Sequence, residues 1–193
     1  MNKVSLEHRA VALDPAAAGA ILTIDLEAVR ENYRRLRARL DAARCAGVVK
    51  ADGYGLGAVQ VAQALMAEGC DTFFVAHVGE GISLRDAIGP KPTIYVLNGI
   101  PPGAERDATG SNLCAVINSL DQFSAWSKAA RDIGHELPAA IQVDSGMSRL
   151  GMAASEVLAL AADPQAFANI EVTLVMSHLA CADEPTHPAN EAQ

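Results

Sequence analysis

Residues 48–57 read Val48-Val49-Lys50-Ala51-Asp52-Gly53-Tyr54-Gly55-Leu56-Gly57. The apolar run at residues 46–49 predicts a buried strand, which we expect to end on Lys50. Three glycines follow, and they allow the backbone to turn tightly directly after the strand. A lysine amine at the end of a buried strand is partly withdrawn from water and can attack a carbonyl carbon. Lys50 is therefore the first candidate for chemistry.

The rest of the chain alternates between strand and helix patterns. Further strands are predicted at residues 72–78, 93–98, 114–118, 139–144 and 172–178. Helices are predicted at residues 58–68, 80–87, 120–133 and 154–162, with a short irregular crossover around 101–107. The strand segments are continuously apolar, which is typical of parallel strands buried on both faces. The pattern predicts an α/β fold, either a barrel or a doubly wound sheet.

Polar residues stand at the ends of the predicted strands, where (β/α) barrels carry their active sites. They are Lys50, His77, Asn98, Asn118, Asp144 and His178. The chain lacks the glycine-rich nucleotide motifs of Rossmann and P-loop proteins, which favours the barrel. We count about six strand–helix units, whereas a closed barrel has eight. We therefore expect a (β/α)8 TIM-type barrel that is incomplete in this chain.

The two ends of the chain have weaker patterns. Residues 1–20 are expected to form a flexible lead-in, and the barrel domain is assigned to residues 21–193. A short strand is predicted at residues 21–24, followed by an amphipathic helix over 26–40 that Asp25 caps. Residues 184–193 contain two prolines and no apolar periodicity, so we expect a loop there.

Charge and cysteine content exclude several classes of function. The net charge of −8 and the absence of a basic patch argue against a surface for nucleic acid or anionic membrane. No apolar run is long enough for a membrane span or a signal peptide. The four cysteines lack metal-ligand spacing and are typical of free thiols in a reducing compartment. We expect a cytoplasmic protein.

Two further segments place polar residues after a strand. Residues 143–151 read VDSGMSRLG, in which Arg149 offers a rigid fork suited to a carboxylate or a phenolate oxygen. Residues 176–183 read MSHLACAD, in which His178 ends a predicted strand. No second histidine or carboxylate lies at ligand spacing from His178, so no metal site is predicted. These two segments and the Lys50 segment are expected at one edge of the sheet.

The three segments, in this order, resemble the motifs of the alanine racemase family. Members of this family are pyridoxal-phosphate enzymes of fold type III. Residues 21–193 resemble the N-terminal barrel domain of that family. The resemblance implies that Lys50 holds pyridoxal 5'-phosphate as a Schiff base and moves the α-proton on one face of the substrate. It further implies that Tyr54 donates to the cofactor phosphate, Arg149 contacts the phenolic oxygen and orients the substrate carboxylate, and His178 packs against the pyridine ring.

One position departs from the family pattern. Many members carry a carbamylated lysine two residues before the motif aspartate, where this chain has Gln142. A glutamine cannot be carbamylated, but its amide oxygen can accept a hydrogen bond from Arg149, more weakly than a charged group would. Four other residues are interpreted as structural: Glu80, Arg85, Asp52 as a cap or polar support, and Trp126 as a packing residue.

The resemblance implies that the protein interconverts L- and D-alanine and supplies D-alanine for peptidoglycan. It also implies a homodimer, in which a tyrosine of the second subunit acts on the opposite face of the substrate. That tyrosine belongs to a C-terminal β-domain that these 193 residues do not contain. The last barrel strands, the phosphate-binding loops and the arginine at the pyridine nitrogen are also absent from them. We therefore expect a fragment or a truncated product that alone racemises alanine poorly or not at all.

Other functions stay open. A racemase of the same fold with broader specificity is one, since Gln142 changes the surroundings of Arg149. A fold-type III decarboxylase is disfavoured because the Lys50 and Arg149 segments fit the racemases better. A barrel that binds the cofactor without turnover, or an inactive product of a disrupted gene, belongs to another class.

Overall fold

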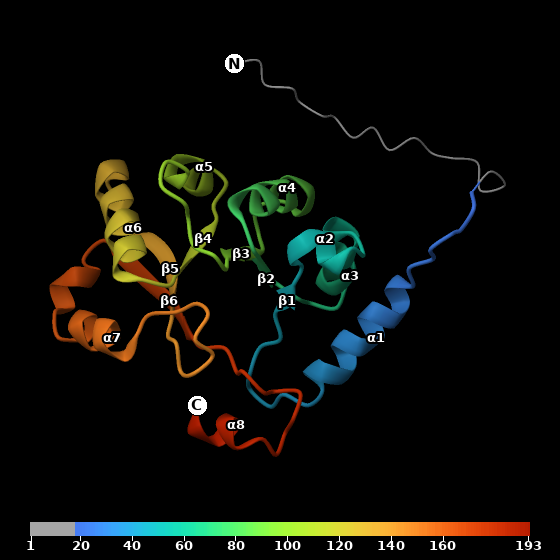
Figure 1. Cartoon of the computed structure of the whole chain (residues 1–193). Coiled ribbons are helices and arrows are strands. Elements are labelled where there is room, and N and C mark those ends of the chain that lie inside the picture. Colours follow the sequence, from blue (N-terminus) through green and yellow to red (C-terminus); the bar gives the residue numbers. More distant parts are fainter. Residues whose placement is uncertain (1–17) are drawn as a thin grey trace.

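The computed structural model describes residues 18–193, which form one sheet of six parallel strands (Figure 1). Each strand pairs with the next strand along the chain, in the order β1 to β6. The strands are β1 (Gly47–Val48), β2 (Thr72–Val75), β3 (Thr93–Val96), β4 (Cys114–Ile117), β5 (Leu137–Gln142) and β6 (Ile170–Met176). The α/β class and the incomplete barrel are thereby confirmed. The predicted flexible lead-in lies almost entirely outside the described residues.

Helices connect the strands and cover one side of the sheet. Figure 1 shows α3 to α7 following one another around the outside of the arc that the strands form. The helices are α1 (Leu26–Arg37), α2 (Lys50–Tyr54), α3 (Ala58–Ala67), α4 (Val78–Ile88), α5 (Glu105–Gly110), α6 (Leu120–Ile133), α7 (Ala154–Ala161), the 3-10 helix η2 (Pro164–Phe167) and α8 (Pro188–Ala192). Within residues 18–193, none of these helices has the length and hydrophobicity that crossing a membrane requires.

The sheet carries a different apolar cluster on each face. Phe73 and Ile94 are fully buried in the main core between the strands and the helices. Their neighbours Phe74 and Tyr95 point to the other face, because successive side chains of a strand alternate, and their rings stack with centroids 5.0 Å apart. The predicted burial on both faces holds for β4, all of whose residues are buried. It fails for β6, where Val175 is 66% exposed because β6 is the last strand of the sheet.

Several predicted boundaries were wrong. Residues 21–24 form no strand, and Leu22 is 80% exposed. The first strand ends at Val48, because the backbone turns into α2 at Lys50. The crossover expected around 101–107 gives way to helix α5, which begins at Glu105 and runs on to Gly110, and the expected loop at 184–193 contains α8. In α8, His187 accepts a hydrogen bond from the Ala189 N–H, and a proline at the first helical position costs no backbone hydrogen bond.

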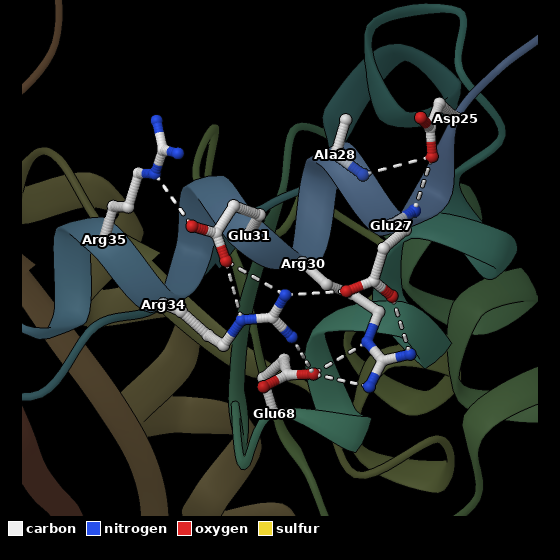
Figure 2. A network of polar contacts seen from close by, with 8 residues as sticks. All are labelled: Asp25, Glu27, Ala28, Arg30, Glu31, Arg34, Arg35 and Glu68. Atoms are coloured by element: carbon white, nitrogen blue, oxygen red, sulfur yellow. Dashed lines mark hydrogen bonds and ion pairs between the residues drawn. The ribbon is translucent and has the colours of Figure 1, made fainter.

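Helix α1 is attached to α3 by a network of charged side chains (Figure 2). Asp25 caps α1 as predicted, since its Oδ1 accepts from the Glu27 and Ala28 N–H groups at 2.9 and 3.1 Å. Arg30 and Arg34 both reach Oε1 of Glu68, at 2.6 and 3.0 Å. These guanidinium groups lower the pKa of the Glu68 carboxyl. Because Glu68 directly follows α3, the network fixes α1 on that helix.

Arg85 and Trp126 have the structural roles expected of them. The Arg85 guanidinium is buried and donates to four backbone carbonyls, those of Gly89, Pro92, Ser111 and Asn112. Burial lowers the pKa of Arg85. Trp126 is 2% exposed and donates through Nε1 to the Pro138 carbonyl at 3.2 Å. Both side chains hold the helix layer on the sheet, away from the strand ends that carry Lys50 and His178.

Candidate active site

A cavity of about 520 Å³ lies at the carboxyl ends of the strands, on the face opposite the helix layer. This volume falls within the roughly 300–1,000 Å³ range of small-molecule sites. All four residues predicted from the sequence line it: Lys50, Tyr54, Arg149 and His178. The rest of the wall is mostly apolar and consists of Val48, Phe74, Ala76, Leu97, Asn98, Gln142, Leu150 and Met176. The cavity therefore brings together side chains from three segments that lie far apart in the sequence.

The backbone after Lys50 forms a left-handed turn. Ala51, Asp52 and Tyr54 have φ angles of 51°, 53° and 57°, and the two glycines between and after them are also positive. Hydrogen bonds from Gly53 N to Val49 O and from Gly55 N to Ala51 O, of 2.9 and 3.0 Å, close the turn. Left-handed helix costs about 1–2 kcal/mol for each residue other than glycine. The glycines predicted the turn, but its extension over three other residues was missed.

The turn brings Lys50 and Tyr54 together. The Lys50 Nζ lies 5.9 Å from the centroid of the Tyr54 ring. Lys50 is half-buried, whereas Tyr54 is 63% exposed at the rim of the cavity. The amine thus lies over the face of the Tyr54 ring, in a cavity whose wall is mostly apolar.

Two carboxylates hold the turn in place. Glu80 Oε1 accepts from the Ala51 N–H at 2.9 Å, and its Oε2 accepts from the Ala76 N–H at 2.7 Å. Asp52 Oδ1 accepts from the Ala58 N–H at 2.8 Å, which confirms its predicted role as a cap. Glu80 was expected to be structural, and its contact with the Lys50 segment was not foreseen. Its position three residues after His77 indicates a capping box, but sequence spacing alone does not identify Ala51 as a partner.

A second loop presents Arg149. Asp144 Oδ1 accepts from the N–H groups of Gly146 and Ser148 at 3.0 and 2.9 Å. These backbone donors lower the pKa of the Asp144 carboxyl. Gly151 closes the loop with a φ of 115°, where a side chain would meet the Asp144 backbone nitrogen at 2.6 Å. The loop thereby turns Arg149 toward the cavity, and within residues 18–193 its guanidinium forms no hydrogen bond or ion pair.

Gln142 does not make the contact predicted for it. Its side chain is buried, and Nε2 donates to the Leu150 carbonyl at 3.2 Å. No hydrogen bond joins Gln142 to Arg149 in the part of the chain that the structure describes. The reason is geometric: the loop returns beside β5, with Met152 N donating to the Gln142 carbonyl at 2.7 Å, so the Leu150 carbonyl faces the amide. Gln142 supports the backbone next to Arg149 rather than its guanidinium.

His178 lies two residues beyond the end of β6, with its ring at the exposed rim. Its carbonyl accepts from Gln193 Nε2 at 3.2 Å, which joins this segment to the end of α8. The cavity therefore combines a mostly apolar wall with four polar groups: an amine, a guanidinium, a phenol and an imidazole. This set suits an anionic aromatic ligand that carries a carbonyl group. No cluster of three metal-ligating side chains occurs among residues 18–193.

The six parallel strands and a cavity at their carboxyl ends define an α/β-barrel domain whose site lies at the strand ends. The chain belongs to the alanine racemase family, since the model of the alanine racemase N-terminal domain matches residues 24–193. The resemblance found in the three sequence segments is thereby confirmed.

Known relatives agree with this assignment. The chain is 68% identical over 178 residues to the catabolic alanine racemase of Mesorhizobium japonicum, covering 92% of this chain and 47% of the relative. It is 49% identical over 177 residues to the alanine racemase of Rhodospirillum rubrum, covering 91% of this chain and 47% of the relative. The chain thus spans about half the length of the curated relatives it matches.

Solved structures show the same architecture. The alanine racemase of Bartonella henselae, crystallised with covalently bound pyridoxal phosphate, matches with a TM-score of 0.83 and 37% identity, over 87% of this chain and 49% of that one. The alanine racemase of Streptomyces lavendulae matches with a TM-score of 0.79 and 34% identity, over 88% and 45% of the two chains.

Proposed function

We propose that the protein containing this chain interconverts L- and D-alanine with pyridoxal 5'-phosphate bound at Lys50. The observation that carries the proposal is the convergence of Lys50, Tyr54, Arg149 and His178 on one cavity. The family membership and the names of the relatives support alanine as the substrate.

The residues around the cavity fit the cofactor. Its aldehyde needs an amine, which Lys50 provides, and its pyridine ring needs an apolar wall such as that of Leu97 and Met176. We assign Tyr54 to the phosphate, Arg149 to the phenolic oxygen and His178 to the face of the ring. When bound, the cofactor supplies the electron sink that makes the α-proton of an amino acid removable.

Each of this chain's residues then has a defined task. The Lys50 amine takes the α-proton on one face of the substrate and returns it there. Arg149 also binds the substrate carboxylate, for which its planar fork is suited because it has no partner among residues 18–193. Inversion needs a second acid–base group on the opposite face, and we assign it to a tyrosine of the partner subunit in a homodimer.

The test is racemisation by the complete gene product. We expect conversion of L- to D-alanine and the reverse, measured by chiral chromatography. Lys50→Ala should lower the rate roughly 10²–10⁴-fold, the usual contribution of a positioned acid–base group. Lys91→Ala, at an exposed lysine outside the cavity, should leave it unchanged. Retention of racemisation by Lys50→Ala would overturn the proposal, and cofactor bound to Lys50 without turnover would indicate a non-catalytic barrel.

The physiological role of the racemisation, either alanine breakdown or D-alanine supply, and the range of substrates are tested separately. Two relatives, at 68% and 49% identity, are catabolic alanine racemases, which favours the breakdown of alanine over the supply of D-alanine for peptidoglycan. Deletion of the gene should then prevent growth on alanine as carbon source without creating a need for D-alanine. Racemisation should be much faster with alanine than with serine, lysine or arginine. Similar rates on all four would support the broad-specificity alternative.

A further inference from the structure

We infer that Glu80 is a positioning residue for Lys50: its carboxylate holds the left-handed turn that aims the lysine amine into the cavity. This inference rests on the role proposed for Lys50. Glu80 does not line the cavity, so it acts through the backbone rather than on a ligand.

The contacts of Glu80 join two strand ends. Oε1 accepts from Ala51 in the turn, and Oε2 accepts from Ala76 and His77 after β2, the latter at 3.3 Å. One carboxylate thus serves three backbone N–H groups. Within residues 18–193, Glu80 is the only side chain that accepts from the Ala51 N–H.

The position of that N–H explains the effect on Lys50. The Ala51 N–H belongs to the peptide plane that joins Lys50 to Ala51. Fixing this plane fixes the ψ angle of Lys50, and with it the direction in which the lysine side chain leaves the backbone. A charged acceptor makes a shorter and stronger hydrogen bond to an N–H group than a neutral one does. Glu80 therefore connects the direction of Lys50 to the rigid end of β2.

The conformation of the turn makes such a support necessary. Ala51 and Asp52 have positive φ angles, a region that residues other than glycine visit only singly and rarely. Asp52 holds the far end of the turn through Ala58, but the near end, next to Lys50, depends on Glu80. Without this acceptor we expect Ala51 to relax toward negative φ, which would swing the Lys50 side chain away from Tyr54.

The chain contains a matched control for this interaction. Glu156 occupies the same capping position in α7, where its carboxylate accepts from the Ala153 N–H at 2.8 Å and from the Leu120 N–H at 3.3 Å. It therefore also joins its own helix start to another segment. Its partners lie outside the turn that carries Lys50, so Glu156→Ala reproduces the loss of a bridging cap without touching that turn.

The experiment measures attachment of pyridoxal 5'-phosphate to Lys50 in the complete gene product. Attachment joins Nζ to the aldehyde carbon with loss of one water, and borohydride reduction followed by peptide mass analysis locates it. We expect Glu80→Ala to slow attachment roughly 10–100-fold, the usual cost of misplacing a reacting group by about an ångström. Glu80→Gln keeps one accepting oxygen and should give an intermediate rate. Glu156→Ala should attach the cofactor at the wild-type rate.

The outcomes separate the two proposals. If the wild-type protein carries no cofactor on Lys50, the function proposed for Lys50 fails. If the wild type does, but Glu80→Ala attaches as fast as Glu156→Ala, only the inference on Glu80 fails. Should Glu80→Ala not fold, as judged by circular dichroism, Glu80→Gln decides: a rate equal to the wild type overturns the inference, and a slower rate supports it.

Discussion

The Asp144 carboxylate accepts a hydrogen bond of 2.9 Å from the backbone N–H of Ser148, one residue before Arg149. Ser148 has a φ of 56°, so this contact stabilises a backbone conformation that residues other than glycine rarely adopt. The side chain of Asp144 therefore acts on the site through the loop, without lining the cavity itself.

Replacement of Asp144 should weaken catalysis more than folding. In Asp144→Ala of the complete gene product the loop loses both N–H contacts, and we expect kcat/KM for the proposed alanine racemisation to fall roughly tenfold with little change in melting temperature. Asp144→Asn keeps an accepting oxygen and should retain most of the activity. An equal loss in both variants would show that charge, rather than acceptor geometry, matters at this position.

A side chain at Gly151 should be poorly tolerated. Its φ of 115° and the 2.6 Å approach to the Asp144 nitrogen leave no room for a Cβ, and the contact is with backbone that cannot move aside. Gly151→Ala should lower the free energy of unfolding by about 2–4 kcal/mol. Gly79→Ala, in α4 with no atom within 4 Å of the added carbon, should be neutral or stabilise by up to about 1 kcal/mol. Denaturant unfolding compares the two, and similar losses would contradict the steric argument.

Arg85 should not be replaceable by lysine. An ammonium has three donors at one point and cannot reach four carbonyls that surround a planar guanidinium. Arg85→Lys should lower the free energy of unfolding by about 2–4 kcal/mol, because buried carbonyls lose their partners. Arg35→Lys, at a side chain 73% exposed and paired with Glu31, should change it by less than about 0.5 kcal/mol. Equal stability of the two variants would contradict the role assigned to Arg85.

The attachment of α1 should depend on pH through Glu68. Its pKa is lowered from 4.5 by Arg30 and Arg34, so its contribution is present above pH 4.5 and is lost as the pH falls through the lower value of the folded state. The protection of α1 amides against hydrogen exchange, measured relative to the intrinsic exchange rate at the same pH, should therefore fall on acidification, and high salt should have the same effect. Glu68→Gln should show fast exchange already at neutral pH.

Asp41→Asn provides the control for that experiment. Asp41 lies just beyond α1 and forms no ion pair within residues 18–193. Its replacement should leave α1 exchange unchanged at neutral pH. A protection of α1 in Glu68→Gln that equals the wild-type value and does not change with pH would show that apolar packing alone holds the helix.

Much of the candidate site could be predicted from local pattern. Apolar runs that end in polar residues indicate parallel strands, and parallel strands bring their carboxyl ends to one edge. That reasoning predicted Lys50, Arg149 and His178 at one edge of the sheet, and all three line the cavity. It failed for residues 21–24, which have the composition of a strand but no neighbouring strand to pair with in the described residues.

The amino-acid pattern alone was enough to predict the strand–helix alternation, the residues at the strand ends and the resemblance to the alanine racemases, because these depend on periodicity and short motifs. Three features follow only from the way the chain packs: the left-handed path after Lys50, the support of that path by Glu80, and the partner of Gln142. These depend on groups such as Ala51 and Glu80 that lie 29 positions apart and meet only when β1 and β2 pair. Local propensity opposes positive φ at Ala51, and a distant acceptor supplements the hydrogen bonds within the turn that hold it there.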